Sequence, residues 1–224
     1  MTGDRKVVRL IRVFVSSPGD VAEEREVLEE VVRRINDIDG QEQGVRLELF
    51  RWETDVVPCI GPSPQENVDA QTPRFDIYLG IMSTRFGTPT GEHGSGTEKE
   101  FRDAVDRWGR TGKPWILFYF DEDPPLPRST DAIEQYLAVR KFHDELLAMG
   151  IIGTFKGVRG SSNGFFEQVD RHLRRILHMW AQGEQETPAP APDLKPVVPQ
   201  AYRDWLRARC TEIGCGSIER RPEK

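Results

Sequence analysis

A glycine-rich segment that ends in two glutamates carries the residue types best suited to chemistry. Residues 83–101 read STRFGTPTGEHGSGTEKEF and combine Arg85, several hydroxyls, and the carboxylates of Glu98 and Glu100. A glycine-rich loop that runs into a helix presents backbone N–H groups to an anion, and an arginine beside it can form a bidentate clamp. A carboxylate in the first turn can bind sugar hydroxyls. We therefore expect this segment to line a site for an anionic ligand that carries hydroxyl groups.

The same glutamates also fit a purely structural role. Ser95 with Glu98, and Thr97 with Glu100, both have the spacing of a capping box, in which the two side chains satisfy free N–H groups at a helix start. Carboxylates in a first turn also complement the helix dipole. Spacing alone leaves both interpretations open for each glutamate.

Further candidates follow the first and second predicted strands. Ser16 and Ser17, in the run SSPG, could hold a phosphate through hydroxyls and amides. The run is neither a Walker loop nor a GxGxxG fingerprint, and composition alone favours a tight turn between strand and helix. Trp52 could stack on a base or pack at the edge of a sheet.

The sequence predicts no metal site and no Ser/His/Asp constellation. His93 has no Cys or Asp at ligand spacing. The three cysteines are too scattered for a zinc site or a disulfide framework. The remaining histidines fall on predicted helices, and we expect them at the surface: His143, His172 and His178.

Hydrophobic periodicity predicts strands and helices in alternation. The predicted strands cover residues 7–15, 45–52, 75–82, 114–120 and 151–158. Helices are predicted from residue 20, near residue 63, and over residues 97–108, 130–149 and 164–180. Asp20 with Glu23 predicts a capping box for the first helix, and Gly40 and Gly44 are expected to end it.

This alternation predicts an α/β fold with a parallel sheet between two helix layers. Five strands favour the flavodoxin-like order 2-1-3-4-5. In such sheets ligands bind beyond the carboxyl ends of the strands, at the switch point beside the first strand. The rule selects the loops at residues 16–20, 52–63 and 83–97.

Composition and charge set the class of protein. The 224 residues include 31 Lys+Arg and 37 Asp+Glu, a net charge of −6, so the chain has no electrostatic footprint for nucleic acid. Its apolar runs are only strand-sized and its start has no signal-peptide pattern, which predicts a cytoplasmic protein without a membrane span. We expect an α/β domain over residues 1–181, a Pro-rich linker over 182–199, and a short helical tail over 200–224 that starts a further module.

Three segments together resemble bacterial TIR-like domains. They are FVSSPGDV with EER (residues 14–21 and 23–25), WET with PQ (52–54 and 64–65), and DIYLGI through RFGTPT to SGTEKEF (76–81, 85–90 and 95–101). The resemblance extends over residues 9–180. The tail sequence YRDWL at residues 202–206 resembles the lead-in to a NACHT-type NTPase module.

The resemblance implies a function. Enzymatic TIR domains cleave the bond between nicotinamide and ribose in NAD, and a glutamate on the helix after the third strand supports the oxocarbenium-like transition state. Glu100, followed by an apolar residue, matches that position best, and Glu98 is the runner-up. The other residues implied at the site are Ser16 and Ser17 on the phosphate side, Arg85, Phe86 and Gly87 at the rim, Thr97, and Trp52 or Phe86 as a stacking ring.

The resemblance also implies the context of the reaction. It implies NAD as the substrate and no cofactor. It also implies an N-terminal effector of bacterial antiphage immunity that is joined to an NTPase or sensor module. The activity of this effector is expected to depend on self-association. One departure is that Gly96-Thr97 stands where TIR enzymes often carry Trp-Cys. Two alternatives remain: a non-catalytic module for nucleotide sensing or self-association, and an N-glycosidase that acts on another nucleotide.

Overall fold

The computed structural model describes residues 8–51, 55, 57, 71–89, 93–150 and 152–181. The chain divides after Pro190 into two units, and the first unit contains all of these residues. Trp52, the short helix expected near residue 63, the Pro-rich linker and the helical tail therefore lie outside the described residues.

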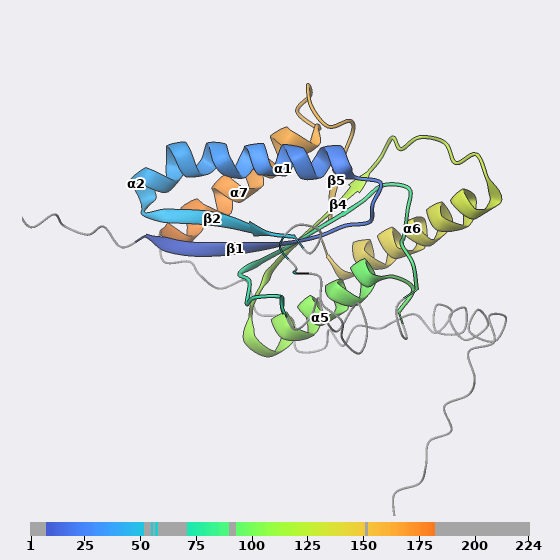
Figure 1. Ribbon diagram of the computed structural model, residues 1–224, viewed down its shortest axis with the longest axis horizontal. Helices are drawn as coiled ribbons and strands as arrows, with labels where there is room; N and C mark the ends of the chain where they lie inside the picture. The colour runs from blue at the N-terminus through green and yellow to red at the C-terminus, as the bar shows by residue number, and fades with distance from the viewer. Residues whose placement is uncertain are drawn as a thin grey trace, which may run out of the picture. The chain divides into compact units, whose positions relative to one another are not determined.

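Five parallel strands form one sheet in the order β2-β1-β3-β4-β5, which confirms the flavodoxin-like fold expected from the alternation. The strands are β1 (Arg9–Ser16), β2 (Val45–Phe50), β3 (Ile77–Met82), β4 (Trp115–Asp121) and β5 (Gly153–Phe155). The helices are α1 (Ala22–Ile35), η1 (Asn36–Gly40), α2 (Gln41–Gln43), α5 (Gly96–Thr111), α6 (Thr130–Met149) and α7 (Phe165–Ala181). Figure 1 shows α1 and α7 on one face of the sheet and α5 and α6 on the other.

Strand alternation divides the buried side chains between the two faces. Val13 and Val15 of β1 pack in the core beneath α1 and α7. Phe14, between them, packs in an aromatic-rich core beneath α5 and α6, together with Tyr78 and Phe118. Successive side chains of a strand point to opposite faces, so Ser16, in phase with Phe14, lies on the α5 side. This register decides which helix Ser16 can contact.

The first helix differs from its prediction at both ends. Val21 occupies the N-cap position without a side-chain cap, so the predicted capping box of Asp20 and Glu23 is wrong. At the other end, the chain continues through the π-helix η1 and α2 and ends at Gly44, whose φ of 66° is left-handed. Only Gly44, and not Gly40, therefore ends the helical segment.

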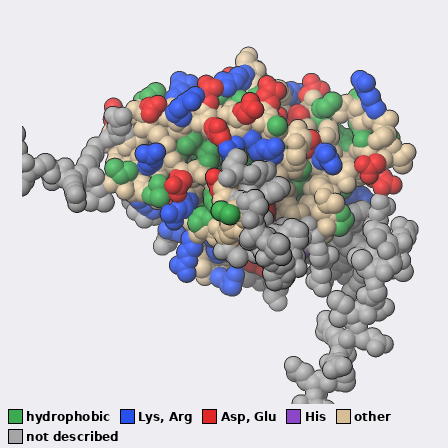
Figure 2. All heavy atoms as spheres, viewed as in Figure 1, with side chains coloured by type: hydrophobic (Ala, Val, Ile, Leu, Met, Phe, Trp, Pro, Cys, Tyr) green, Lys and Arg blue, Asp and Glu red, His purple; other side chains and the backbone are tan. Residues whose placement is uncertain are grey.

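The surface presents charges of both signs. On the face shown in Figure 2, Lys and Arg side chains lie among Asp and Glu side chains without a broad area of one sign. Among the described helices, none combines the length and the apolar content that a bilayer crossing requires.

His172 of α7 is partly buried, which corrects its expected surface position. Its Nδ1 lies 2.8 Å from the hydroxyl of Tyr119, a fully buried residue of β4. Burial, and next the neighbouring Arg171 and Arg175, lower the pKa of His172. Burial also raises the pKa of Tyr119, so we assign its hydroxyl as the donor and a neutral imidazole as the acceptor.

We expect this pair to make the stability of the domain depend on pH. Because the folded state lowers the pKa of His172, the unfolded chain takes up this proton first as the pH falls. Stability is therefore complete above the unfolded pKa of about 6.5 and is lost as the pH decreases below it. Denaturant unfolding between pH 8 and pH 5 should show a flatter dependence for His172→Gln. The exposed His178 of the same helix is the control, and His178→Gln should keep the wild-type slope.

Candidate functional site

A carboxylate and a hydroxyl meet at the switch point of the sheet. The Ser16 hydroxyl, at the end of β1, donates to Glu100 Oε2 of α5 at 2.5 Å. Ser16 is fully buried, and Glu100 is partly exposed. The two residues are 84 positions apart in the chain, and they come together because the start of α5 packs against the end of β1.

Tyr78 of β3 lies beside this pair. Its side chain is fully buried, and its hydroxyl donates to the Thr97 carbonyl in the first turn of α5 at 3.3 Å. Burial, and then the charge of Glu100, raise the pKa of Tyr78 well above its usual value, against an opposing hydrogen bond with Ser16. Tyr78 fits the sequence pattern of a buried apolar strand, so no sequence signal distinguishes it as a site residue.

Glu98 is held on another side of α5. Ser95 is the N-cap, and its hydroxyl accepts a hydrogen bond from the Glu98 N–H at 3.1 Å. The Glu98 carboxylate accepts from the Gly94 N–H at 2.8 Å and pairs with Arg102 at 3.3 Å. Of the two capping interpretations, the structure therefore uses Ser95 with Glu98.

Arg102 joins Glu98 to a second buried carboxylate. Its guanidinium binds both oxygens of Glu145 on α6, one of them at 2.8 Å, and lies 5.7 Å from the centre of the Phe142 ring. Burial alone lowers the pKa of Arg102, but Glu145 and Glu98 outweigh it and raise that pKa. Arg102 thus offsets part of the negative charge of Glu98 and Glu145 within the core, and the triad connects α5 to α6.

Residues 84–87 of the loop after β3 do not present the free N–H groups that the glycine-rich sequence predicts. Asp20 Oδ2 accepts from the Thr84 N–H, the Thr84 hydroxyl and the Arg85 N–H at 2.8, 2.8 and 2.9 Å. The next two N–H groups, of Phe86 and Gly87, donate to Gln135 Oε1 of α6 at 2.9 and 3.0 Å. Four consecutive amides are therefore engaged by two side chains from other elements, so an anion has no access to them in this conformation.

The remaining candidates divide between buried and exposed positions. Phe86 is buried and packs edge-on against Phe142, so its ring is not presented to a ligand. Gly87 has a φ of 111°, and a Cβ there would lie 3.0 Å from that of Ser95. Thr97 is buried in the first turn of α5, whereas Arg85 is exposed.

The loop after β1 is held from the α1 side. Arg25 of α1 donates to the Ser17 hydroxyl at 3.0 Å and to the Pro18 carbonyl at 2.9 Å. This arrangement separates the two serines, because Ser16 contacts Glu100 whereas Ser17 contacts Arg25.

Acidic side chains lie near the start of α1. Glu24 is buried, and its pKa is raised first by burial and further by Asp121, Glu23 and Asp20. Asp121, at the end of β4, accepts from the Ser83 hydroxyl at 2.9 Å. Carboxylates of Glu24 and Asp121 therefore lie near the start of α1, where Arg25 contacts the SSPG run.

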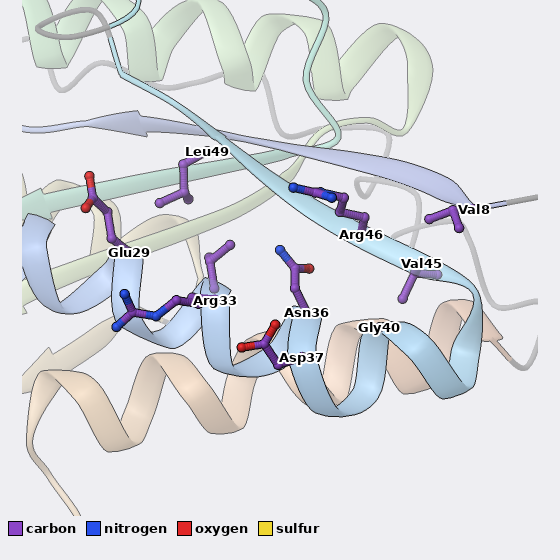
Figure 3. A pocket seen from close by; sticks show the side chains of 10 residues that line it. Val8, Glu29, Arg33, Asn36, Asp37, Gly40, Val45, Arg46 and Leu49 are labelled. Atoms are coloured by element: carbon purple, nitrogen blue, oxygen red, sulfur yellow. The ribbon is translucent and has the colours of Figure 1, made fainter.

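A hollow lies away from these residues, between α1, η1 and β2. It has a volume of about 500 Å³, and Figure 3 shows Glu29, Arg33 and Asp37 on the helical side facing Arg46 and Leu49 of β2. The amide of Asn36 is already bonded to the backbone of Leu47 in both directions, at 2.9 and 2.8 Å. This amide, which lines the hollow, therefore stabilises the fold.

We expect Asp20 to stabilise the loop after β3 and not the start of α1. Asp20→Ala leaves two N–H groups and one hydroxyl without their acceptor, so the free energy of unfolding should fall by about 1–3 kcal/mol. Hydrogen exchange of the Thr84 and Arg85 amides should accelerate. Glu23→Ala is the matched control, with an expected change within about 0.5 kcal/mol. Equal effects of the two variants would restore the capping-box interpretation.

The fold and this geometry define a flavodoxin-like α/β domain with a carboxylate–hydroxyl pair at the switch point of its sheet. Residues 12–169 match the family described as Domain of unknown function (DUF4062), and the chain belongs to this family. Neither a TIR nor a NACHT family model matches. None of the curated proteins compared with the chain matches it.

Proposed function

We propose that this chain is a TIR-like effector that cleaves the nicotinamide–ribose bond of NAD when several copies associate. The observation that carries the proposal is the 2.5 Å hydrogen bond from Ser16 to Glu100 at the carboxyl ends of β1 and β3. Open α/β sheets bind their ligands at this switch point. The sequence resemblance to TIR-like domains supports the choice of NAD.

Glu100 is the carboxylate proposed to act on the substrate. In the reaction, the C–N bond between nicotinamide and ribose breaks, its electron pair leaves with nicotinamide, and a water oxygen bonds to C1′ and releases a proton. A carboxylate beside the ribose stabilises the positive charge that develops on the sugar. An ionised carboxylate accepts about four hydrogen bonds, so the bond from Ser16 is compatible with contacts to ribose hydroxyls.

Helix geometry and charge balance favour Glu100 over Glu98. Residues two apart on an α-helix point about 200° apart around its axis, so the two carboxylates face different sides. Glu98 is 1% exposed and pairs with Arg102, which offsets part of its charge within the core. Glu100 is partly exposed beside Ser16.

Self-association and a connection to an NTPase or sensor module complete the proposal. They rest on the sequence resemblance of residues 9–180 and of the tail at 202–206. In this arrangement, a trigger sensed elsewhere in the longer protein brings copies of the domain together, and NAD is consumed in the infected bacterial cell.

A turnover assay with enforced clustering tests the function. The full chain, fused to a scaffold that holds several copies together, is incubated with NAD, and nicotinamide is measured by chromatography with mass spectrometry. We expect nicotinamide release that depends on clustering. A folded, clustered protein that leaves NAD intact would overturn the proposal. Free nucleotides in parallel samples separate NAD cleavage from cleavage of another N-glycosidic bond, and calorimetry that detects binding without turnover would favour a sensing module.

A further inference from the structure

The hydroxyl of Tyr78 is a polar group placed within an aromatic core. The ring lies 6.0 Å from Phe14, 6.1 Å from Phe101 and 6.5 Å from Phe118, between centroids. A phenylalanine would fill the same space without a polar atom, and a buried hydroxyl is unfavourable unless it is hydrogen-bonded. The hydrogen-bond partner of this buried hydroxyl therefore indicates why a tyrosine stands here.

The hydroxyl reaches the turn of α5 that carries Glu100. It donates to the carbonyl of Thr97 at 3.3 Å, and residues three apart lie on the same face of a helix. Ser16, from the neighbouring strand, donates directly to the Glu100 carboxylate. β1 and β3 are adjacent in the sheet, so two neighbouring strands hold the same face of α5.

We propose that Tyr78 is a positioning residue for Glu100, which together with Ser16 fixes the orientation of the carboxylate toward the substrate. This inference rests on the proposed function of Glu100. Tyr78 itself touches no substrate, and it acts through the Thr97 carbonyl, to which its hydroxyl donates.

The electrostatics around Tyr78 keep it a hydrogen-bond donor. Burial first, and the negative charge of Glu100 next, raise the pKa of Tyr78 well above its usual value, and Asp103 adds to this effect. Asp103 is itself paired with Lys99 at 2.9 Å. The tyrosine therefore stays protonated over the whole physiological range, and its hydrogen bond to the Thr97 carbonyl does not change with pH.

Two variants and one matched control test the inference. Tyr78→Phe and Ser16→Ala remove one hydroxyl each from the chain of contacts to Glu100. Tyr119→Phe is the control, because Tyr119 is an equally buried tyrosine of the next strand whose hydroxyl faces His172 of α7 instead. The measurements are nicotinamide release by the clustered protein and titration of Glu100 by carbon NMR, with Glu100→Gln assigning the signal.

We expect Tyr78→Phe to lower kcat about tenfold or more with little change in KM, as a misplaced catalytic group does. Loss of a hydrogen bond to the carboxylate should raise the titration midpoint of Glu100 by about one pH unit in Ser16→Ala, and in the same direction in Tyr78→Phe. Tyr119→Phe should change neither quantity. Wild-type kcat and titration in Tyr78→Phe would overturn the inference, and so would an equal loss of kcat in Tyr119→Phe.

The two readouts distinguish failure of this inference from failure of the proposed function. If the wild type cleaves no nucleotide but the variants still shift the titration of Glu100, the positioning contacts stand and the proposed reaction fails. If the wild type cleaves NAD but Tyr78→Phe behaves like it in both measurements, the reaction stands and Tyr78 has no positioning role.

Discussion

Glu100→Gln is expected to lower nicotinamide release by the clustered protein by about 10²–10³-fold, the usual effect of removing a group that stabilises charge in a transition state. Glutamine keeps an oxygen that can accept from Ser16 and keeps the size of the side chain, but it lacks the negative charge that faces the ribose. The loss should therefore appear in kcat, while the melting temperature stays close to that of the wild type. Steady-state kinetics and thermal unfolding of the same preparations measure both.

Glu98→Gln is the matched control, because it makes the same change two residues away. This variant loses half of the negative charge that balances Arg102 in the core, so it should unfold at a lower temperature. Below that transition it should retain nicotinamide release within a few-fold of the wild type. The opposite pattern, with turnover lost only in Glu98→Gln, would transfer the catalytic role to Glu98.

Arg102→Ala should have the largest effect on stability. Arg102 lies between the carboxylates of Glu98 and Glu145, whose side chains alone are 2% and 8% exposed. Removing one member of a buried ion pair typically lowers the free energy of unfolding by about 3–5 kcal/mol, or roughly 10 °C in melting temperature for a domain of this size. Denaturant titration at neutral pH measures the change.

A matched surface variant tests the cause of that loss. Arg12→Ala is the control, because its ion pair with Glu48 is 41% and 52% exposed and should contribute less than about 1 kcal/mol. A loss in Arg102→Ala no larger than that in Arg12→Ala would contradict the role of the buried ion pairs.

Local patterns predicted the fold. The alternation of apolar strands with amphipathic helices indicated a parallel sheet, and its order 2-1-3-4-5 is confirmed. α6 was predicted over residues 130–149 and occupies Thr130–Met149. These features follow from periodicities over a few residues, because burial of one face acts separately on each strand and helix.

Two predictions made from local sequence patterns are wrong, because the residues contact distant segments of the chain. Asp20 has the spacing of a helix cap, but its carboxylate binds Thr84 and Arg85 instead. His172 looks like a surface residue of an amphipathic helix, yet it accepts a hydrogen bond from Tyr119. In both cases the partner is more than fifty residues away, and no local pattern contains it.

The two glutamates after the glycine-rich loop show most clearly the limit of what the sequence predicts. The sequence determined that both lie near the start of a helix after the third strand, and that residues two apart must face different sides of it. Which glutamate faces the switch point depends on the rotation of α5 about its axis. That rotation is set by Ser16 and Tyr78 of the sheet on one side and by Glu145 of α6, through Arg102, on the other. These groups meet only in the folded chain, so the tertiary structure alone separates the capping glutamate, Glu98, from the one that lies beside Ser16, Glu100.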